Sequence, residues 1–320
     1  MVSSRETESL AKGVLDINTN TGVENNRHRK YLELNLDLSP TIEFKIGNQI
    51  VSIHAFNAAD TQQNLNKQAV NIIASGPSIV DVDFTDLLAT ATIFINGSIS
   101  LTAQHHFTNI VGYVISDARF ILHQYDILEK YYTGQPLYAT LAVLEALAIA
   151  HPQIIENHHH QIRIIYPVDR PWGVKANDSE FSRLLLKKDS QLQALNRKTP
   201  LSAFAQHPQF VIDSQHQPAS IGLSLDMTHG FVEAGTVTYV ATQLAFSRGA
   251  GAIHLYGLDL LNSNEPRFYE DKERSAPTVL NNVISNTIVP SFNLLAKTYQ
   301  QLGVNIVNHS PISQSLFDFN

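Results

Sequence analysis

Two short runs of small residues follow apolar, strand-like segments and could bind a ligand through their backbone. The first apolar segment leads into Ser75-Gly76-Pro77-Ser78, and a second ends at Asn96-Gly97-Ser98. Gly76 has no Cβ and lets a ligand approach the main chain, while Pro77-Ser78 can begin a helix whose free N–H groups suit a phosphate. The alternative for both runs is an ordinary strand-to-helix turn.

A third predicted strand ends in small residues far downstream in the sequence. We refer to these three strand ends as tips. Residues 235–260 read as a helix, a glycine-marked stop at Gly249 and Gly251, and an apolar strand that ends in Gly257-Leu258-Asp259. Strands that alternate with helices predict a parallel sheet, and such sheets bind ligands beyond the carboxyl ends of their strands. The three tips therefore belong at one edge of the predicted sheet.

The ordered motifs carry a resemblance to a known group of enzymes. SGPS, FINGS, AGTVTYVA, YGLDL and HSPIS occur in this order over residues 71–125 and 220–316. The series resembles bacterial glycosyltransferases that use CMP-activated 2-keto-3-deoxy sugars. These include the CMP-sialic acid transferases of surface glycans and the 3-deoxy-manno-octulosonate (Kdo) transferases of lipopolysaccharide core and capsule. The resemblance implies an α/β fold with a Rossmann-like, mostly parallel sheet flanked by helices, a GT-A-like variant.

The chain divides into three predicted zones. Residues 1–29 are rich in Asn, Ser, Thr and Glu and are predicted to be disordered or loosely attached. Residues 30–68 alternate in strand fashion around Gly47-Asn48 and predict a small β unit, either a hairpin edge or an acceptor-binding addition. Residues 69–320 form the transferase domain, with a buried helix over 137–150 and a lid at about 261–290.

The resemblance assigns several residues to the nucleotide-sugar donor. It places Gly235 and Thr236 against the donor carboxylate, Asn96 on phosphate or cytidine, and Gly257 and Asp259 beside cytidine or its ribose. The full set of expected donor contacts is Ser75, Gly76, Pro77, Ser78, Asn96, Gly97, Asp117, Gly235, Thr236, Gly257, Asp259, Arg267, Tyr269, His309 and Ser310. For Asp117 the alternative is a helix cap, and for His309-Ser310 the expected contact is a phosphate or the acceptor.

Cationic and phenolic groups in the predicted lid could stabilise the leaving phosphate in place of a metal. Arg267, Tyr269, Lys272 and Arg274 are the candidates. Asp81-Val82-Asp83 fits an Asp-x-Asp pattern but follows the SGPS run rather than a metal-facing strand tip, and His158 to His160 predict an exposed loop rather than a metal site. The predicted enzyme therefore needs no cofactor or metal beyond the CMP-activated donor.

The general base is a point at which this chain departs from the resembled enzymes. Inverting sialyltransferases carry a lid histidine, but residues 261–308 contain none. Asp226 and His229, just before the helix that starts near Gly235, offer an alternative as base, nucleophile or proton shuttle. The structural alternative is that Asp226 caps a turn and His229 packs beneath a loop.

Composition limits the class of protein. The chain has 320 residues, no cysteine and a formal charge of −7, which excludes thiolate chemistry and disfavours nucleic-acid binding. No apolar run approaches the roughly 18 residues that cross a bilayer, and the first residues do not resemble a signal peptide. We therefore expect a cytoplasmic enzyme, with possible attachment to the inner-membrane surface, and the oligomeric state stays open.

The leading hypothesis is transfer of Kdo or a related keto sugar from CMP to a lipopolysaccharide-type or glycolipid acceptor. Sialic acid is the alternative donor. Two further classes fit parts of the pattern. One is a pterin diphosphokinase-like enzyme that uses ATP and Mg²⁺, and the other is a non-catalytic nucleotide- or glycan-binding module.

Overall fold

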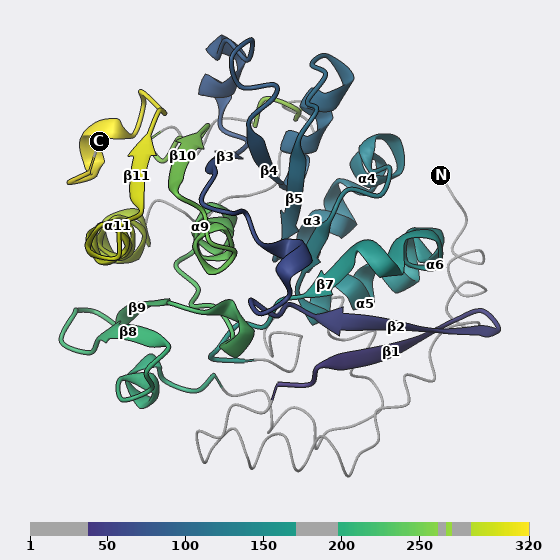
Figure 1. Cartoon of the computed structure of the whole chain (residues 1–320), viewed down its shortest axis with the longest axis horizontal. Coiled ribbons are helices and arrows are strands. Elements are labelled where there is room, and N and C mark those ends of the chain that lie inside the picture. Colours follow the sequence, from purple (N-terminus) through teal and green to yellow (C-terminus); the bar gives the residue numbers. More distant parts are fainter. Residues whose placement is uncertain (1–37, 171–197, 262–266, 271–282, 320) are drawn as a thin grey trace.

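The computed structural model describes residues 38–170, 198–261, 267–270 and 283–319. A nine-stranded sheet runs through it, flanked by helices on both faces (Figure 1). The sheet strands are β1 (Thr41–Ile46), β2 (Gln49–Ala55), β3 (Ala69–Ile73), β4 (Ala91–Ile95), β5 (Ile110–Ile115), β6 (Leu137–Ala139), β7 (Ile162–Ile164), β10 (Ala252–Tyr256) and β11 (Asn305–Asn308). A separate two-stranded antiparallel sheet contains β8 (Phe210–Asp213) and β9 (Ile221–Ser224).

The strand order is β1-β2-β7-β6-β5-β4-β3-β10-β11, and every pairing except β1 with β2 is parallel. The predicted α/β fold with a mostly parallel sheet is confirmed. The predicted hairpin around Gly47-Asn48 is also confirmed. Its second strand pairs with β7, so the hairpin extends the edge of the main sheet, which is the first of the two roles considered for residues 30–68.

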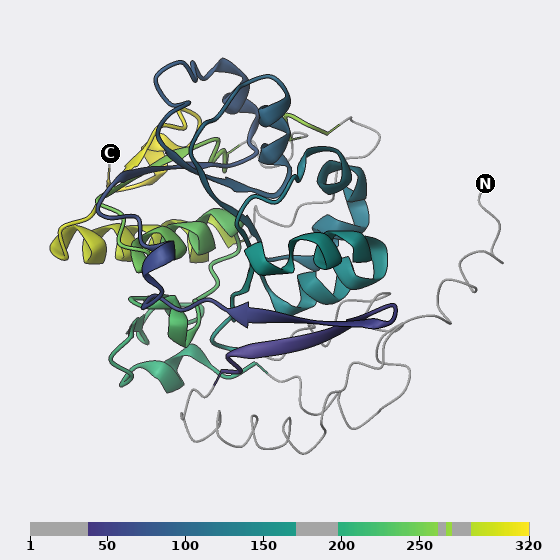
Figure 2. The same ribbon diagram turned by 45° about the vertical axis from the view of Figure 1, so that its right-hand side comes forward.

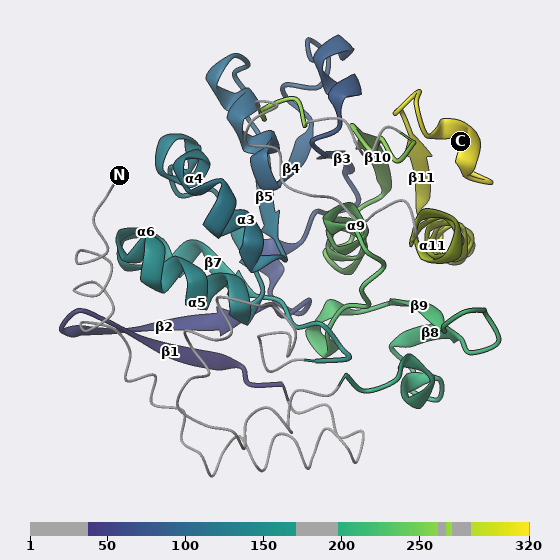
Figure 3. The same cartoon turned by 180° about the vertical axis from the view of Figure 1, so that it is seen from behind.

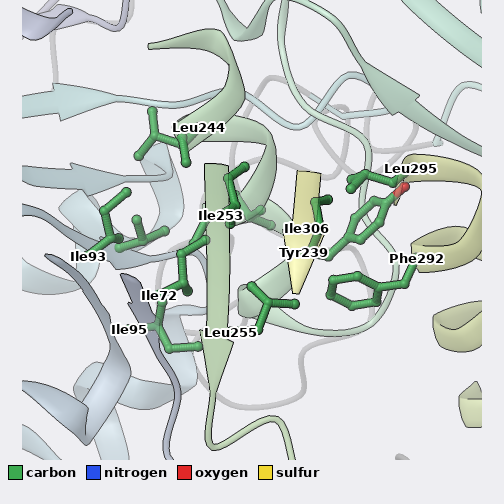
Figure 4. Packing of buried hydrophobic residues seen from close by; sticks show 14 of the residues in the cluster. Ile72, Ile93, Ile95, Tyr239, Leu244, Ile253, Leu255, Phe292, Leu295 and Ile306 are labelled. Atoms are coloured by element: carbon green, nitrogen blue, oxygen red, sulfur yellow. The ribbon is translucent and has the colours of Figure 1, made fainter. Parts of the chain in front are cut away.

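The central strands are apolar because both of their faces are covered. All five residues of β4, ATIFI, are buried. One face packs against α9 (Val237–Ser247) and α11 (Val289–Gln301), which lie side by side in Figures 1 and 2. Figure 4 shows part of the resulting core, in which the strand residues Ile72 and Leu255 belong to one buried cluster with Tyr239 of α9 and Phe292 of α11.

The other face is covered by a group of four helices, gathered on one side of the sheet in Figure 3. They are α3 (Ala118–His123), α4 (Tyr125–Tyr131), α5 (Leu141–Ala150) and α6 (Pro152–His158). The prediction of one helix over 137–150 is wrong at its start. Residues 137–139 form β6, because they pair with β5 on one side and β7 on the other. An apolar run alone does not separate a buried strand from a buried helix.

Candidate functional site at the carboxyl ends of the strands

The tips of β3 and β10 are joined through their backbones. Ala74 N donates to Tyr256 O at 2.8 Å, and Gly76 N donates to Gly257 O at 2.9 Å. Gly257 adopts φ +70°, a left-handed conformation that glycine takes without strain. The sequence prediction that the SGPS and GLD tips meet at one edge of the sheet is therefore confirmed.

Asp259 has a different partner from the one expected. Its carboxylate accepts hydrogen bonds from Ser78 N at 2.6 Å and from Ser78 Oγ at 2.7 Å. The segment after Gly76 is a short 3₁₀ helix, η2 (Pro77–Asp81), of five residues. The prediction that the Ser78 N–H is free for a phosphate is wrong, because the protein's own carboxylate already occupies it. Asp259 is 9% exposed and locks the β3 and β10 tips together.

The tip of β4 presents an unpaired acceptor. Asn96 adopts φ +48°, which Asn tolerates better than most residues, and its carbonyl oxygen accepts from Tyr113 Oη at 2.8 Å. Its side-chain Oδ1 is buried and has no hydrogen-bond partner in the described part of the chain. Ser98 Oγ donates to Ile73 O at 2.6 Å and holds this tip against β3. Asn96 is thus fixed in place with an acceptor available to a ligand.

Residues 267–270 of the predicted lid lie across these tips. Phe268 N donates to Ser75 O at 3.3 Å, and the ring of Tyr269 lies against Gly97 so closely that a Cβ there would be 2.1 Å from it. Burial raises the pKa of Tyr269 to about 12, although nearby Arg267 and Ser75 partly oppose this shift. The structure therefore brings Ser75, Gly97 and Tyr269 together.

Arg267 is paired within the same segment. Its Nη1 lies 2.9 Å from Oε1 of Glu270, whose side chain is 3% exposed. Burial opposes the charge of the guanidinium, but Tyr269 and Glu270 outweigh it and raise the pKa of Arg267. Arg267 is thus a permanent cation beside the strand tips. Lys272 and Arg274, the other predicted lid cations, lie outside the described residues.

The tip of β11 supplies His309 and Ser310. Ser310 Oγ accepts from Leu258 N at 2.7 Å, so this serine fastens β11 to the tip of β10. The His309 ring stacks on Tyr256 with centroids 4.6 Å apart, and its Nε2 lies 2.9 Å from Nδ1 of His254. The prediction that His309-Ser310 lie beside the other tips is confirmed.

Asp117 lies at the tip of β5, on the same edge. Its carboxylate accepts from Arg119 N at 2.9 Å and caps α3, and it also pairs with the Arg119 guanidinium. The capping alternative is confirmed. A contact between Asp117 and the donor stays a prediction.

Gly235 and Thr236 begin α9. Since α9 leads directly into β10, the helix runs antiparallel to that strand and its N-terminus lies toward the carboxyl ends. Thr236 Oγ1 accepts from Thr238 N at 3.3 Å, so the hydroxyl acts as the helix cap. Gly235 has φ +80° and lies against Ile288. The predicted contact with a donor carboxylate stays a prediction.

Asp226 and His229 are not brought to this cluster. Asp226 accepts from Thr228 N at 2.8 Å and caps a short turn, and the adjacent Met227 N donates to Ser247 Oγ at the C-terminal end of α9. An 11-residue helix is about 16 Å long, so this turn is separated by that length from Thr236. The turn therefore lies away from Thr236 at the N-terminus of α9, and the catalytic role expected for Asp226 and His229 stays a prediction.

We predict that Asp226→Asn retains transfer, because asparagine caps a turn about as well as aspartate. Asp226→Ala should lose about 1 kcal/mol of stability without a specific loss of turnover. Released CMP and urea unfolding measure the two effects. A folded Asp226→Asn protein without turnover would restore the catalytic assignment.

Asp81-Val82-Asp83 and His158 to His160 have residue types common in metal sites, although the sequence favours a metal site at neither. Asp83 accepts from Thr85 N and Oγ1, and His158 ends α6 while His159 and His160 continue as a 3₁₀ turn rather than a loop. Within the described ranges no three His, Cys, Asp or Glu side chains gather as metal ligands.

No helix in the described ranges is long and apolar enough to span a bilayer.

Sequence reasoning missed the partners that fix the tips. Tyr113, Ser98 and His254 lie within apolar strands or turns, and their contacts to Asn96, Ile73 and His309 join residues 17 to 55 positions apart. Only the polar character of Ser98 in an apolar run and of His254 in the strand AIHLY signals a role.

The fold is that of an α/β protein with a mostly parallel sheet, and the candidate site lies at the carboxyl edge of that sheet. The model of the 3-deoxy-D-manno-octulosonic acid transferase WaaZ family matches residues 54–317, and the chain belongs to this family. The resemblance stated from the motifs is confirmed, and the protein is a glycosyltransferase.

Proteins similar to this chain include the following two. A probable 3-deoxy-manno-octulosonic acid transferase of Salmonella typhimurium strain LT2 is 24% identical over 257 residues, which cover 79% of this chain and 87% of that protein. The sialyltransferase CstII from Campylobacter jejuni, solved with cytidine-5'-monophosphate, has a TM-score of 0.36 and 13% identity, and the match covers 79% of this chain and 84% of that one.

Proposed function

We propose that the protein transfers Kdo, or a related 2-keto-3-deoxy sugar, from its CMP-activated form to a lipopolysaccharide-type glycan. Family membership supports the transferred sugar. The donor would lie over the tips of β3, β4 and β10, beneath residues 267–270. Transfer would take place in the cytoplasm or at the inner face of the inner membrane, and without a divalent metal.

The observation that carries the donor assignment is the unpaired Oδ1 of Asn96. A buried acceptor without a donor costs about 1–3 kcal/mol, so a ligand that supplies one is favoured. The ribose hydroxyls and the cytosine amino group of CMP are such donors. Tyr269 and Arg267 lie beside Gly97 and Ser75 and can donate to the leaving phosphate, where negative charge develops.

Asn96→Ala is expected to weaken CMP binding by about 1–3 kcal/mol, or roughly 5- to 150-fold, because the ligand then loses its acceptor. Isothermal titration with CMP measures the change. Asn66→Ala is a matched control, since Asn66 also has a left-handed backbone, with φ +50°, but is exposed. Equal CMP affinity in the wild type and in Asn96→Ala would show that the nucleotide binds elsewhere on the protein.

The choice of donor is tested by incubation with CMP-Kdo and CMP-sialate separately, followed by assay of released CMP before and after dialysis against EDTA. We expect CMP to be released from CMP-Kdo at a similar rate before and after dialysis against EDTA. Thermal stabilisation by CMP or CTP, rather than by ATP with Mg²⁺, separates the transferase from a kinase. Release from CMP-sialate alone would instead identify a sialyltransferase.

A further inference from the structure

Transfer to a sugar hydroxyl requires a group that removes its proton, and this inference rests on the proposed function. Among the described residues, three carboxylates at the strand tips are already engaged. Asp259 accepts two hydrogen bonds from Ser78, Asp117 is paired with Arg119, and Glu270 with Arg267. Their oxygens are therefore already used as hydrogen-bond or ion-pair acceptors within the protein, and are not free to take the proton of an acceptor hydroxyl.

His309 differs from these groups. Its side chain is exposed at the tip of β11, one residue before Ser310, which binds the backbone of the β10 tip. The contacts of its ring in the described structure are with Tyr256 and His254, both neutral groups at pH 7. The ring is nevertheless partly shielded from water, and this partial desolvation lowers the pKa of His309, with a further lowering by His254. The imidazole is therefore unprotonated at neutral pH, as a base must be.

His254 can fix which nitrogen of His309 is free. Its Nδ1 lies 2.9 Å from Nε2 of His309, and two imidazole nitrogens at this distance share one proton. If Nε2 of His309 carries that proton and donates it to His254, the lone pair of His309 lies on Nδ1. His254 then holds the ring in one tautomer, as the third residue of a catalytic triad does. Burial lowers the pKa of His254 as well, which keeps it a neutral acceptor.

We propose that His309 is the general base of the transfer and that His254 is its positioning residue. Nδ1 of His309 takes the proton of the acceptor hydroxyl as the acceptor oxygen bonds to the anomeric carbon of the donor. The bond from that carbon to the phosphate oxygen breaks, and CMP leaves with the electron pair. The resulting imidazolium keeps its Nε2–H hydrogen bond to neutral His254.

An acceptor without a proton separates a base from a merely structural residue. His309→Asn should lower transfer from CMP-Kdo to rough-type lipopolysaccharide by about 10²- to 10⁴-fold, the usual range for loss of a general base. Transfer to sodium azide, an anion with no proton to lose, should stay close to the wild-type rate. His106→Asn is the matched control, because His106 is an exposed histidine outside the site.

The role of His254 is tested by rescue with a conservative variant. Asn places a carbonyl oxygen near the position of the imidazole Nδ1, so His254→Asn should keep most of the transfer to lipopolysaccharide. His254→Leu fills the space but offers no acceptor, and it should approach the loss seen in His309→Asn while CMP affinity is unchanged. Equal activity of the Asn and Leu variants overturns the positioning role.

The outcomes for the base and for the donor are distinguishable. If the wild type is active and His309→Asn is equally active, the assignment of His309 as general base is overturned while the proposed donor stands. Loss of both the lipopolysaccharide and the azide reactions in His309→Asn also overturns that assignment, since that pattern indicates a structural role. A wild type that neither binds CMP nor releases it from CMP-Kdo overturns the proposed donor, and the base with it.

Discussion

Gly76→Ala is expected to abolish donor binding and to lower the free energy of unfolding by about 2–6 kcal/mol, the sum of overpacking and a stranded hydrogen-bonding group. A Cβ at this position would lie 2.5 Å from both Asp259 Oδ2 and Gly257 O. The Gly257 oxygen belongs to the backbone and accepts from Gly76 N, so it cannot retreat without breaking that bond. The Asp259 carboxylate would leave Ser78 and open the join between β3 and β10.

Urea unfolding and titration with CMP measure the two effects of Gly76→Ala. Gly47→Ala is the control. Gly47 lies in the β1–β2 turn with φ +58°, and a Cβ there meets nothing within 4 Å. Its substitution therefore costs only the backbone strain of roughly 1–2 kcal/mol. If Gly76→Ala were no more damaging than Gly47→Ala, and CMP still bound, the join between the two tips would not support the site.

The sheet was predictable from the sequence because local pattern determines it. ATIFI of β4 and IVGYVI of β5 are continuous apolar runs, which are typical of strands buried on both faces, and small residues follow several of them. Where the pattern is ambiguous, prediction failed. Leu137 to Ala139 precede a helix of similar apolarity, and only their pairing with β5 and β7 makes them a strand.

The site was only partly predictable, because its contacts join distant residues. Small residues marked the strand tips that approach one another, since close backbone approach requires them. The partner of Asp259 is Ser78, 181 positions away, and no local signal distinguishes a carboxylate that locks a loop from one that faces a ligand. Asp226 is only ten positions before Thr236, but it contacts the opposite end of α9. Distance along the chain is therefore a poor guide to distance in the fold when a helix intervenes.

Gly97→Ala is expected to weaken CMP binding at least tenfold, which corresponds to about 1.4 kcal/mol, with a smaller loss of stability than Gly76→Ala. A Cβ on Gly97 would lie 2.1 Å from Cε1 and 2.3 Å from Cζ of Tyr269. The tyrosine ring can move away, whereas the backbone beside Gly76 cannot. Gly97→Ala should therefore reduce CMP affinity more than it reduces stability. Tyr269 would leave Ser75 and Arg267, and the donor would lose the phenol above the β4 tip.

A double-mutant cycle isolates this contact. Tyr269→Ala removes the ring that Gly97→Ala would displace, so the second substitution should add little once the first is present. Strictly additive losses of CMP affinity would mean that Gly97 acts by another route, such as a change in the left-handed turn at Asn96. Strong non-additivity would instead show that Gly97 is small because Tyr269 must lie against it. In that case residues 267–270 contribute to the donor site through this one ring contact, and the lid depends on a glycine about 170 positions earlier in the chain.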